Sequence, residues 1–225
     1  MSKNDDSDQV DETRQKLFEA ALSHIPFDGW SRTSLRKAAA DIGASDGEAE
    51  LAYPGGAQDL VAYFIADADA KMIEALGKLD MSEMRVRDRI RAAVKARIEA
   101  ITELREAERK AIVFLAMPLN AAFGLKCLAK TVDAMWRAVG DSSTDFAYYS
   151  KRAILAGVYS ATILYWLSDE SDGFEESWAF LDRRIDDVMQ FEKAKARFRD
   201  KEEDRPHLTD LLRRVRYPDQ LRMKP

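Results

Sequence analysis

Apolar residues recur along most of the chain at intervals of three and four, which is the spacing of an α-helix with one buried face. Few segments alternate between apolar and polar residues as half-buried strands do. The pattern therefore predicts an all-α protein. The predicted helices cover residues 12–25, 34–40, 46–53, 57–77, 82–104, 106–117, 119–139, 145–167, 174–199 and 208–216.

Glycine and proline separate these helices, as expected for residues that break a helix or allow a tight turn. The breaking residues are Pro26, Gly29, Gly43, Pro54, Gly55, Gly56, Pro118, Gly140 and Gly173. The boundaries predict an acidic disordered tail over 1–11, a small helical subdomain over 12–56, a larger bundle over 57–199 and a basic tail over 200–225.

The longest apolar stretch without a charge is AILAGVYSATILYWL, residues 153–167. It is shorter than the roughly 20 residues that a membrane-spanning helix needs, so we interpret it as a buried core helix. Small residues such as Gly157, Ser160 and Ala161 recur along this helix at helical spacing. They leave space that either a neighbouring helix or a ligand can fill.

The overall composition narrows the possible functions. The formal net charge is −5 and the pI is about 5.3, which argues against a nucleic-acid-binding polycation. A single cysteine, Cys127, excludes a disulfide framework and a cysteine-rich zinc site, and two histidines offer little for catalysis. The sequence contains none of the common nucleotide-binding, hydrolase or metalloprotease motifs. We therefore expect a non-enzymatic protein without metal or cofactor.

Residues 31–60 have the pattern of a helix-turn-helix. Leu35, Ala38, Ala39 and Ile42 form an apolar face, Gly43 permits a turn, and a second short helix follows Ser45. This segment resembles the DNA-binding end of TetR-type regulators. The resemblance implies a TetR-like helical bundle with an N-terminal helix-turn-helix subdomain.

The charge of the second helix argues against DNA recognition. It carries Asp46, Glu48 and Glu50, and no lysine or arginine occurs between Lys37 and Lys71. DNA affinity depends largely on cations that neutralise phosphates, so we expect no nucleic-acid partner. A TetR-type repressor that responds to a ligand is the alternative function.

The C-terminal half contains the blocks GDSSTDFAYYSKRAILAGVYSAT, residues 140–162, and DGFEESWAFLDRRIDD, residues 172–187. Both blocks resemble the COQ9 family of ubiquinone-biosynthesis accessory proteins. Residues 21–30 and 53–60 fit the same family, and the resemblance extends over roughly residues 13–190. Ala147-Tyr148-Tyr149 replaces the Asn-Trp-Tyr that is usual in the family.

The resemblance implies a TetR-type fold that no longer serves transcription. Members bind isoprenoid lipids or quinone intermediates, associate with membranes, form homodimers and help the hydroxylase of the ubiquinone pathway to reach its substrate. By this resemblance, residues 57–199 would form the lipid-binding and dimerisation bundle. We expect a cytoplasmic protein attached peripherally to a membrane, because residues 1–11 have the features of neither a signal nor a transit peptide.

The apolar faces of three predicted helices supply the candidate lipid-binding residues. They are Phe114, Leu115, Met117, Phe123, Leu128, Val132, Gly157, Ser160, Ala161, Leu164 and Tyr165. Ordinary core packing or a dimer interface would use the same residue types.

The corner between the helices at 119–139 and 145–167 is the candidate surface for the hydroxylase, since the family uses this region for that partner. Its candidate residues are Met135, Trp136, Asp145, Phe146, Tyr148, Tyr149 and Arg152. Exposed aromatic and methionine side chains are typical of interfaces. In the alternative interpretation, Trp136 and Phe146 close the core beneath the loop.

The last segment is a candidate membrane anchor. Residues 205–225 contain six lysines or arginines and two aspartates, a net charge of +4. A basic amphipathic helix can lie on an anionic membrane. Docking on the acidic body of the protein, near Asp186 or Glu192, is the alternative. The candidate membrane-binding residues are Leu208, Leu211, Leu212, Arg213, Arg214, Val215 and Arg216.

Overall fold

The computed structural model describes the backbone of residues 3–141 and 146–203, and the side chains of residues 10–141 and 148–191. The chain divides into two compact units, residues 1–182 and 183–225. Across the described backbone every regular element is a helix, which confirms the predicted all-α class. In the same part of the chain, none of the helices is both long and apolar enough to cross a membrane.

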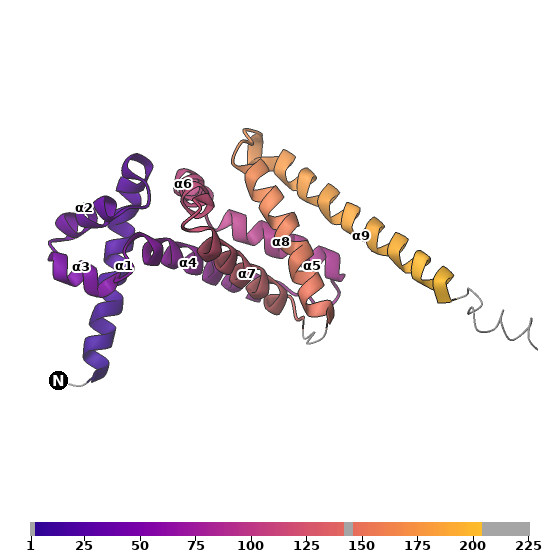
Figure 1. Ribbon diagram of the computed structural model, residues 1–225, viewed down its shortest axis with the longest axis horizontal. Helices are drawn as coiled ribbons and strands as arrows, with labels where there is room; N and C mark the ends of the chain where they lie inside the picture. Colours follow the sequence, from indigo (N-terminus) through magenta and orange to yellow (C-terminus); the bar gives the residue numbers. More distant parts are fainter. Residues whose placement is uncertain (1–2, 142–145, 204–225) are drawn as a thin grey trace, which may run out of the picture. The chain divides into compact units, whose positions relative to one another are not determined.

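The first unit begins with a helix-turn-helix subdomain, formed by α1 (Lys3–Asp28), α2 (Arg32–Ile42) and α3 (Asp46–Ala52), which pack on one another (Figure 1). Gly43 ends α2 with a φ of +70°, a conformation that costs a residue with a side chain about 1–2 kcal/mol. Ser45 starts α3 through a capping box, since its hydroxyl accepts from the Glu48 N–H while Glu48 accepts from the Ser45 N–H.

The first helix is longer than the sequence indicates. α1 begins at Lys3 rather than at residue 12, so residues 3–11, which we expected to form a disordered tail, are helical. It also continues through Pro26 to Asp28. Proline has a φ compatible with a helix and lacks only the N–H donor. The end is set instead by Gly29, which has a φ of +66° and donates its N–H to Ile25 O at 2.9 Å.

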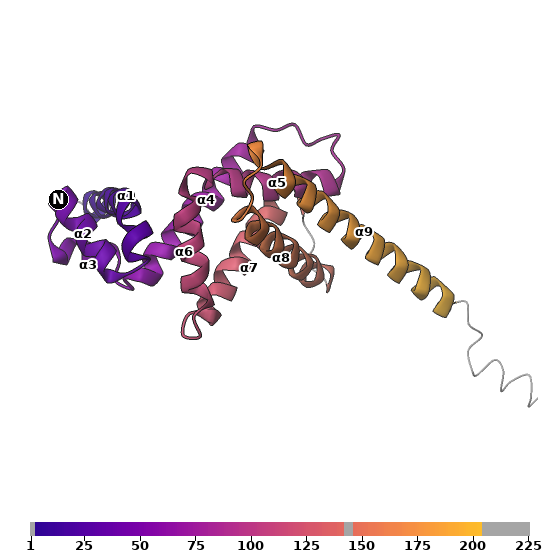
Figure 2. The ribbon, with the colours of Figure 1, turned by 90° about the horizontal axis from the view of Figure 1, so that it is seen from above.

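The rest of the first unit is a bundle built on α4 (Ala57–Gly77), α5 (Val86–Glu99), α6 (Arg105–Ala116), α7 (Ala121–Ala138) and α8 (Phe146–Trp166). Helix α4 packs against both α5 and α7, and α7 also packs against α6 and α8 (Figures 1 and 2). Trp30 joins the two subdomains, because its indole N–H donates to Ala107 O at 2.9 Å and its ring contacts Phe64.

Several predicted boundaries shift. The helix predicted over 82–104 is divided into α5 and a 3₁₀ turn, Thr102–Leu104, because buried Ile101 leaves the helical region with a φ of −120°. The helix predicted over 174–199 is α9 (Glu175–Glu203), preceded by a 3₁₀ turn, Asp172–Phe174. The helix predicted over 208–216 lies outside the described residues.

Candidate functional site

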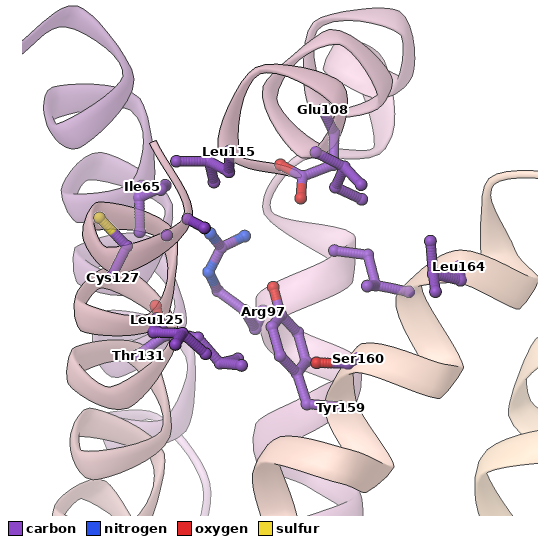
Figure 3. Close-up of a pocket in the computed structure, with 15 residues that line it drawn as sticks. Ile65, Arg97, Glu108, Leu115, Leu125, Cys127, Thr131, Tyr159, Ser160 and Leu164 are labelled. Carbon is purple, nitrogen blue, oxygen red and sulfur yellow. The ribbon is translucent and has the colours of Figure 1, made fainter. Parts of the chain in front are cut away.

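A cavity of about 420 Å³ opens inside the bundle and receives side chains from α4, α5, α6, α7 and α8 (Figure 3). This volume lies within the range of pockets that hold small organic ligands. Most of the wall is apolar, and its apolar side chains are Ile65, Ile112, Leu115, Ala121, Leu125, Leu128, Ile163 and Leu164.

Exposed leucines lie among the lining residues. Leu125 on α7 is 68% exposed and Leu164 on α8 is 55% exposed, although both line the cavity. Exposed apolar groups beside an apolar cavity give a hydrophobic molecule a path that avoids polar surface. The geometry therefore suits a ligand with a long apolar portion.

Two charged side chains and a tyrosine lie against this apolar wall. Arg97 on α5 is 1% exposed, Glu108 on α6 is 6% exposed, and Tyr159 on α8 is also 6% exposed. Figure 3 shows the guanidinium, the carboxyl and the phenol hydroxyl directed toward the same region of the cavity. Burying charged groups is costly, so such a cluster is a strong candidate for a functional group.

A hydrogen-bond chain holds part of this cluster. Arg97 Nε donates to Asp69 Oδ1 at 2.7 Å, and the Thr131 hydroxyl donates to Asp69 Oδ2 at 2.9 Å. Burial raises the pKa of Asp69, and the partners Arg97 and Thr131 oppose this rise. Burial also raises the pKa of Glu108 and of Tyr159, so the Tyr159 hydroxyl keeps its proton at neutral pH.

Sequence patterns identified part of the wall. Among the candidate lipid-binding residues, the structure brings Leu115, Leu128, Ser160 and Leu164 to the cavity. Outside its lining lie Phe114, Met117, Phe123, Val132, Gly157, Ala161 and Tyr165.

On α8, the rotation of the helix explains why some of the predicted residues lie outside the cavity lining. Successive residues of a helix turn by about 100°, so Ala161 and Tyr165 point well away from the face that carries Ser160 and Leu164. Tyr165 stacks on Phe180 with ring centroids 4.6 Å apart. On α7, Val132 is fully buried in the core.

The sequence patterns missed Arg97 and Glu108, the two charged members of the cluster, although each position carries a signal. Arg97 falls on the buried face of α5 with Ala93 and Val94. Glu108 falls on the buried face of α6, with Ala107 and Ala111 as neighbours. A charge at an apolar helical position is the signal that could have identified both residues.

Two of the residues predicted to meet a hydroxylase are internal. Met135 is fully buried and Trp136 is 9% exposed, so the interpretation of these two side chains as exposed interface groups is wrong. Helix α7 turns this face toward its neighbours, and the Trp136 indole N–H donates to Lys151 O at 3.2 Å. In contrast, Tyr149 is 70% exposed. The side chains of Asp145 and Phe146 lie outside those described.

A compact charge network supports the same corner. The Arg152 guanidinium lies 3.4 Å from the centroid of the Tyr148 ring, and Arg152 Nε donates to Asp133 Oδ1 at 2.7 Å. The Tyr148 hydroxyl donates to the same oxygen at 3.0 Å. Burial acts to raise the pKa of Asp133, but the hydrogen bonds from Arg152 and Tyr148 lower it overall. Asp133 is therefore an anion that holds both side chains in place.

The candidate membrane-binding residues lie outside the described part of the chain. These are Leu208, Leu211, Leu212, Arg213, Arg214, Val215 and Arg216.

A solved structure has a similar fold. The TetR transcriptional regulator from Nitrosomonas europaea superposes with a TM-score of 0.62 at 18% sequence identity, over 76% of this chain and 95% of the regulator. At this identity the match concerns the fold alone. The predicted TetR-like architecture is confirmed.

Sequence comparisons identify relatives. Residues 121–192 match the COQ9 family model. The chain is 32% identical to the mitochondrial ubiquinone biosynthesis protein COQ9 of Rattus norvegicus over 82% of this chain and 61% of the relative. It is 33% identical to COQ9-B of Xenopus laevis over 83% and 66%, respectively, and 30% identical to the Homo sapiens protein over 82% and 60%. The matches thus span roughly three fifths to two thirds of the relatives' lengths, and the chain belongs to the COQ9 family.

Proposed function

We propose that this protein is a non-catalytic accessory protein of ubiquinone biosynthesis that binds an isoprenoid quinone intermediate. The observation that carries the proposal is the apolar cavity of about 420 Å³ within the bundle. Each methylene group that a ligand buries there contributes about 0.8 kcal/mol. The names of the relatives, which are ubiquinone biosynthesis proteins, supply the class of lipid.

A single substitution in the cavity wall tests this function. Ser160 lines the cavity on α8, and Ser160→Phe would fill part of the space a lipid needs. Ala153 is exposed on the same helix, so Ala153→Phe is a control of equal bulk that leaves the cavity open. Circular dichroism and urea unfolding would establish that both variants are folded.

The readout is native mass spectrometry of the purified full-length protein, followed by extraction and identification of its lipids. We expect the wild-type protein and Ala153→Phe to carry a prenylated lipid, and Ser160→Phe to carry much less. Recovery of no prenylated lipid from the wild-type protein, or equal recovery from folded Ser160→Phe, would contradict the proposal.

Presentation of the lipid at a membrane to a hydroxylase is the second part of the proposal. The positive charge of residues 205–225 supports attachment to anionic lipid, because each cation near such a surface contributes about 1 kcal/mol. We expect the full chain to sediment with vesicles that contain phosphatidylserine, and the double variant Arg213→Glu, Arg214→Glu to sediment less. Equal sedimentation of the two proteins in low salt would count against this part.

The exposed aromatic ring at the corner is the proposed contact with the hydroxylase. Tyr149 is 70% exposed, whereas Met135 and Trp136 would act by supporting the corner from within. Tyr149→Ala should weaken co-purification with the hydroxylase and leave the thermal unfolding temperature nearly unchanged. Unchanged co-purification would remove Tyr149 from the interface.

The same bundle is the proposed site of homodimerisation. Size-exclusion chromatography with light scattering would test this, and a monomer at micromolar concentration would contradict it.

A TetR-type repressor is the second candidate function, favoured by the helix-turn-helix and by the fold of the Nitrosomonas europaea regulator. The charge of α3 opposes it, and Lys37 near the motif is already paired with Asp28 at 2.6 Å. A gel-shift experiment with the upstream region of the gene at low salt would distinguish the two functions. A salt-sensitive, specific shift would favour the repressor.

A further inference from the structure

Two polar atoms in the cavity wall have unmet hydrogen-bonding capacity. Among the residues that the structure describes, Arg97 Nη1 and Glu108 Oε2 are buried without a hydrogen-bond partner. Both residues line the cavity and are more than nine-tenths buried, and Figure 3 shows their side chains directed toward each other. Buried polar groups in proteins are nearly always paired, so a ligand group is a natural partner for these two atoms.

Arg97 and Glu108 differ in how their charges and hydrogen bonds are satisfied by neighbouring residues. The Arg97 guanidinium already has an anionic partner, Asp69, through its Nε. The positive charge of Arg97 also acts on Glu108, where it opposes the rise in pKa that burial causes. Within the described residues, however, Glu108 Oε2 accepts no hydrogen bond, so the fold supplies this carboxyl with an attractive charge but with no donor at that oxygen.

We propose that Arg97, Glu108 and Tyr159 bind the head group of the lipid, and that this head group is a hydroxyl on an otherwise apolar molecule. A hydroxyl has one donor and two acceptor sites. It can accept from Arg97 Nη1 and from the Tyr159 hydroxyl, and it can donate to Glu108 Oε2. This inference rests on the proposed lipid-binding function and names the group by which the lipid is recognised.

Other polar head groups fit the cluster less well. A quinone carbonyl only accepts hydrogen bonds, so it would leave the acceptor Glu108 Oε2 without a donor. A carboxylate or phosphate would place a further negative charge beside Glu108 and Asp69, and an ammonium group would lie against Arg97. A hydroxyl satisfies both the donor and the acceptor without adding a charge to the cavity.

A set of matched probes tests the proposal on the full-length protein. Farnesylphenol, farnesylbenzene and farnesylbenzoquinone share a prenyl chain and a ring but differ in the polar group. Competition between them, measured by native mass spectrometry, gives their relative dissociation constants. We expect farnesylphenol to bind about tenfold more tightly than farnesylbenzene, the effect of about one buried hydrogen bond to a charged group, with the quinone weaker than the phenol.

Farnesol serves as a second hydroxyl source. If farnesol competes as well as farnesylphenol, the cluster recognises any prenyl hydroxyl. If only the phenol competes, the aromatic ring contributes as well. Either result supports recognition of the hydroxyl, and the comparison identifies which kind of hydroxyl is preferred.

Two variants connect the preference to the cluster. Glu108→Leu removes the acceptor and leaves the Arg97–Asp69 pair balanced, while Tyr159→Phe removes one donor and keeps the ring. We expect Glu108→Leu to abolish the preference for phenol over farnesylbenzene, and Tyr159→Phe to reduce it a few-fold. Glu106→Leu makes the same change as Glu108→Leu at an exposed position of α6 outside the cavity lining, so it is the control and should retain the full preference.

The outcomes separate this inference from the proposed function. Equal binding of farnesylphenol and farnesylbenzene to the wild-type protein would overturn the hydroxyl assignment and leave lipid binding in place. A preference that survives in folded Glu108→Leu would also overturn it. Binding of no farnesyl probe at all would overturn both the assignment and the proposed lipid-binding function.

Discussion

Arg97 and Asp69 form a buried ion pair in which the Nε–Oδ1 distance is 2.7 Å and the two side chains are 2% and 13% exposed. Because Asp69 also accepts a hydrogen bond from Thr131, the pair joins α5, α4 and α7 beside the cavity. It fixes the position of the guanidinium whose Nη1 remains available to a ligand. The pair therefore links the stability of the bundle to the geometry of the proposed site.

Removal of one member of this pair should be strongly destabilising. We expect Asp69→Leu to lower the free energy of unfolding by about 3–5 kcal/mol, because it leaves the buried Arg97 without its hydrogen-bonded counterion. The measurement is urea unfolding followed by circular dichroism. Glu74 and Lys78 form an exposed pair of the same 2.7 Å length, so Glu74→Gln is the control and should change the unfolding energy by less than about 1 kcal/mol. Equal destabilisation by Asp69→Leu and Glu74→Gln would contradict the burial assigned to the Arg97–Asp69 pair.

The acid stability of the protein should depend on Asp169. Burial acts to raise the pKa of this carboxyl, but hydrogen bonds from the side chains and N–H groups of Ser171 and Ser177 lower it to about 2. A lowered pKa in the folded state contributes stability above the unfolded pKa of about 4 and loses it as the pH falls toward 2. We expect Asp169→Asn to remove roughly 2 kcal/mol of this pH-dependent stability.

The measurement is urea unfolding at a series of pH values from neutral to acid. Asp80 provides the control because it accepts hydrogen bonds from the N–H and hydroxyl of Ser82 in the same Asp-x-Ser arrangement, but it is exposed. The Ser82 hydrogen bonds also lower the pKa of Asp80, but water screens this exposed carboxyl, so Asp80→Asn should change the pH dependence less than Asp169→Asn does. If the wild-type and Asp169→Asn curves run parallel over this range, the low pKa of Asp169 is wrong.

The same glycine-to-alanine change should have opposite signs at two positions. At both Gly43 and Gly157 an added Cβ would meet no atom within 4 Å, so steric crowding does not distinguish the two positions. Gly43 has a φ of +70°, and Gly43→Ala should lower the free energy of unfolding by about 1–2 kcal/mol. Gly157 lies within α8, and Gly157→Ala should raise it by about 0.5–1 kcal/mol. Two changes of the same sign in thermal or urea unfolding would contradict this assignment of backbone conformations.

The acidic character of α3 should limit DNA binding. Glu50 is exposed and takes no part in the capping box, so Glu50→Lys changes the surface charge without breaking the helix start. We expect it to raise non-specific DNA affinity and to steepen the salt dependence by about one unit of slope. Glu48→Lys is a less suitable test, because it would also remove the capping interaction with Ser45. Unchanged affinity of Glu50→Lys in a low-salt filter-binding assay would contradict the charge argument.

The repeat of apolar positions determined much of the secondary structure. The predicted range 57–77 agrees with α4, and the predicted helices at 119–139 and 145–167 agree with α7 and α8 to within a few residues at each end. Local interactions explain this agreement, because helical periodicity and turn glycines act over a few neighbouring residues. Pro26 misled the prediction, since a single proline does not end a helix whose other residues continue it.

The site required the tertiary structure. The sequence alone determined an all-α chain of the COQ9 type, an acidic α3 and a small-residue face near Ser160. It could not determine that Arg97 and Glu108 meet from α5 and α6, nor that Tyr165 turns to Phe180 instead of the cavity. Helical periodicity tells which face of a helix is buried but not which neighbour covers it. The pairing of distant helices, and the hydrogen bonds left unmade between them, are decided only when the bundle packs.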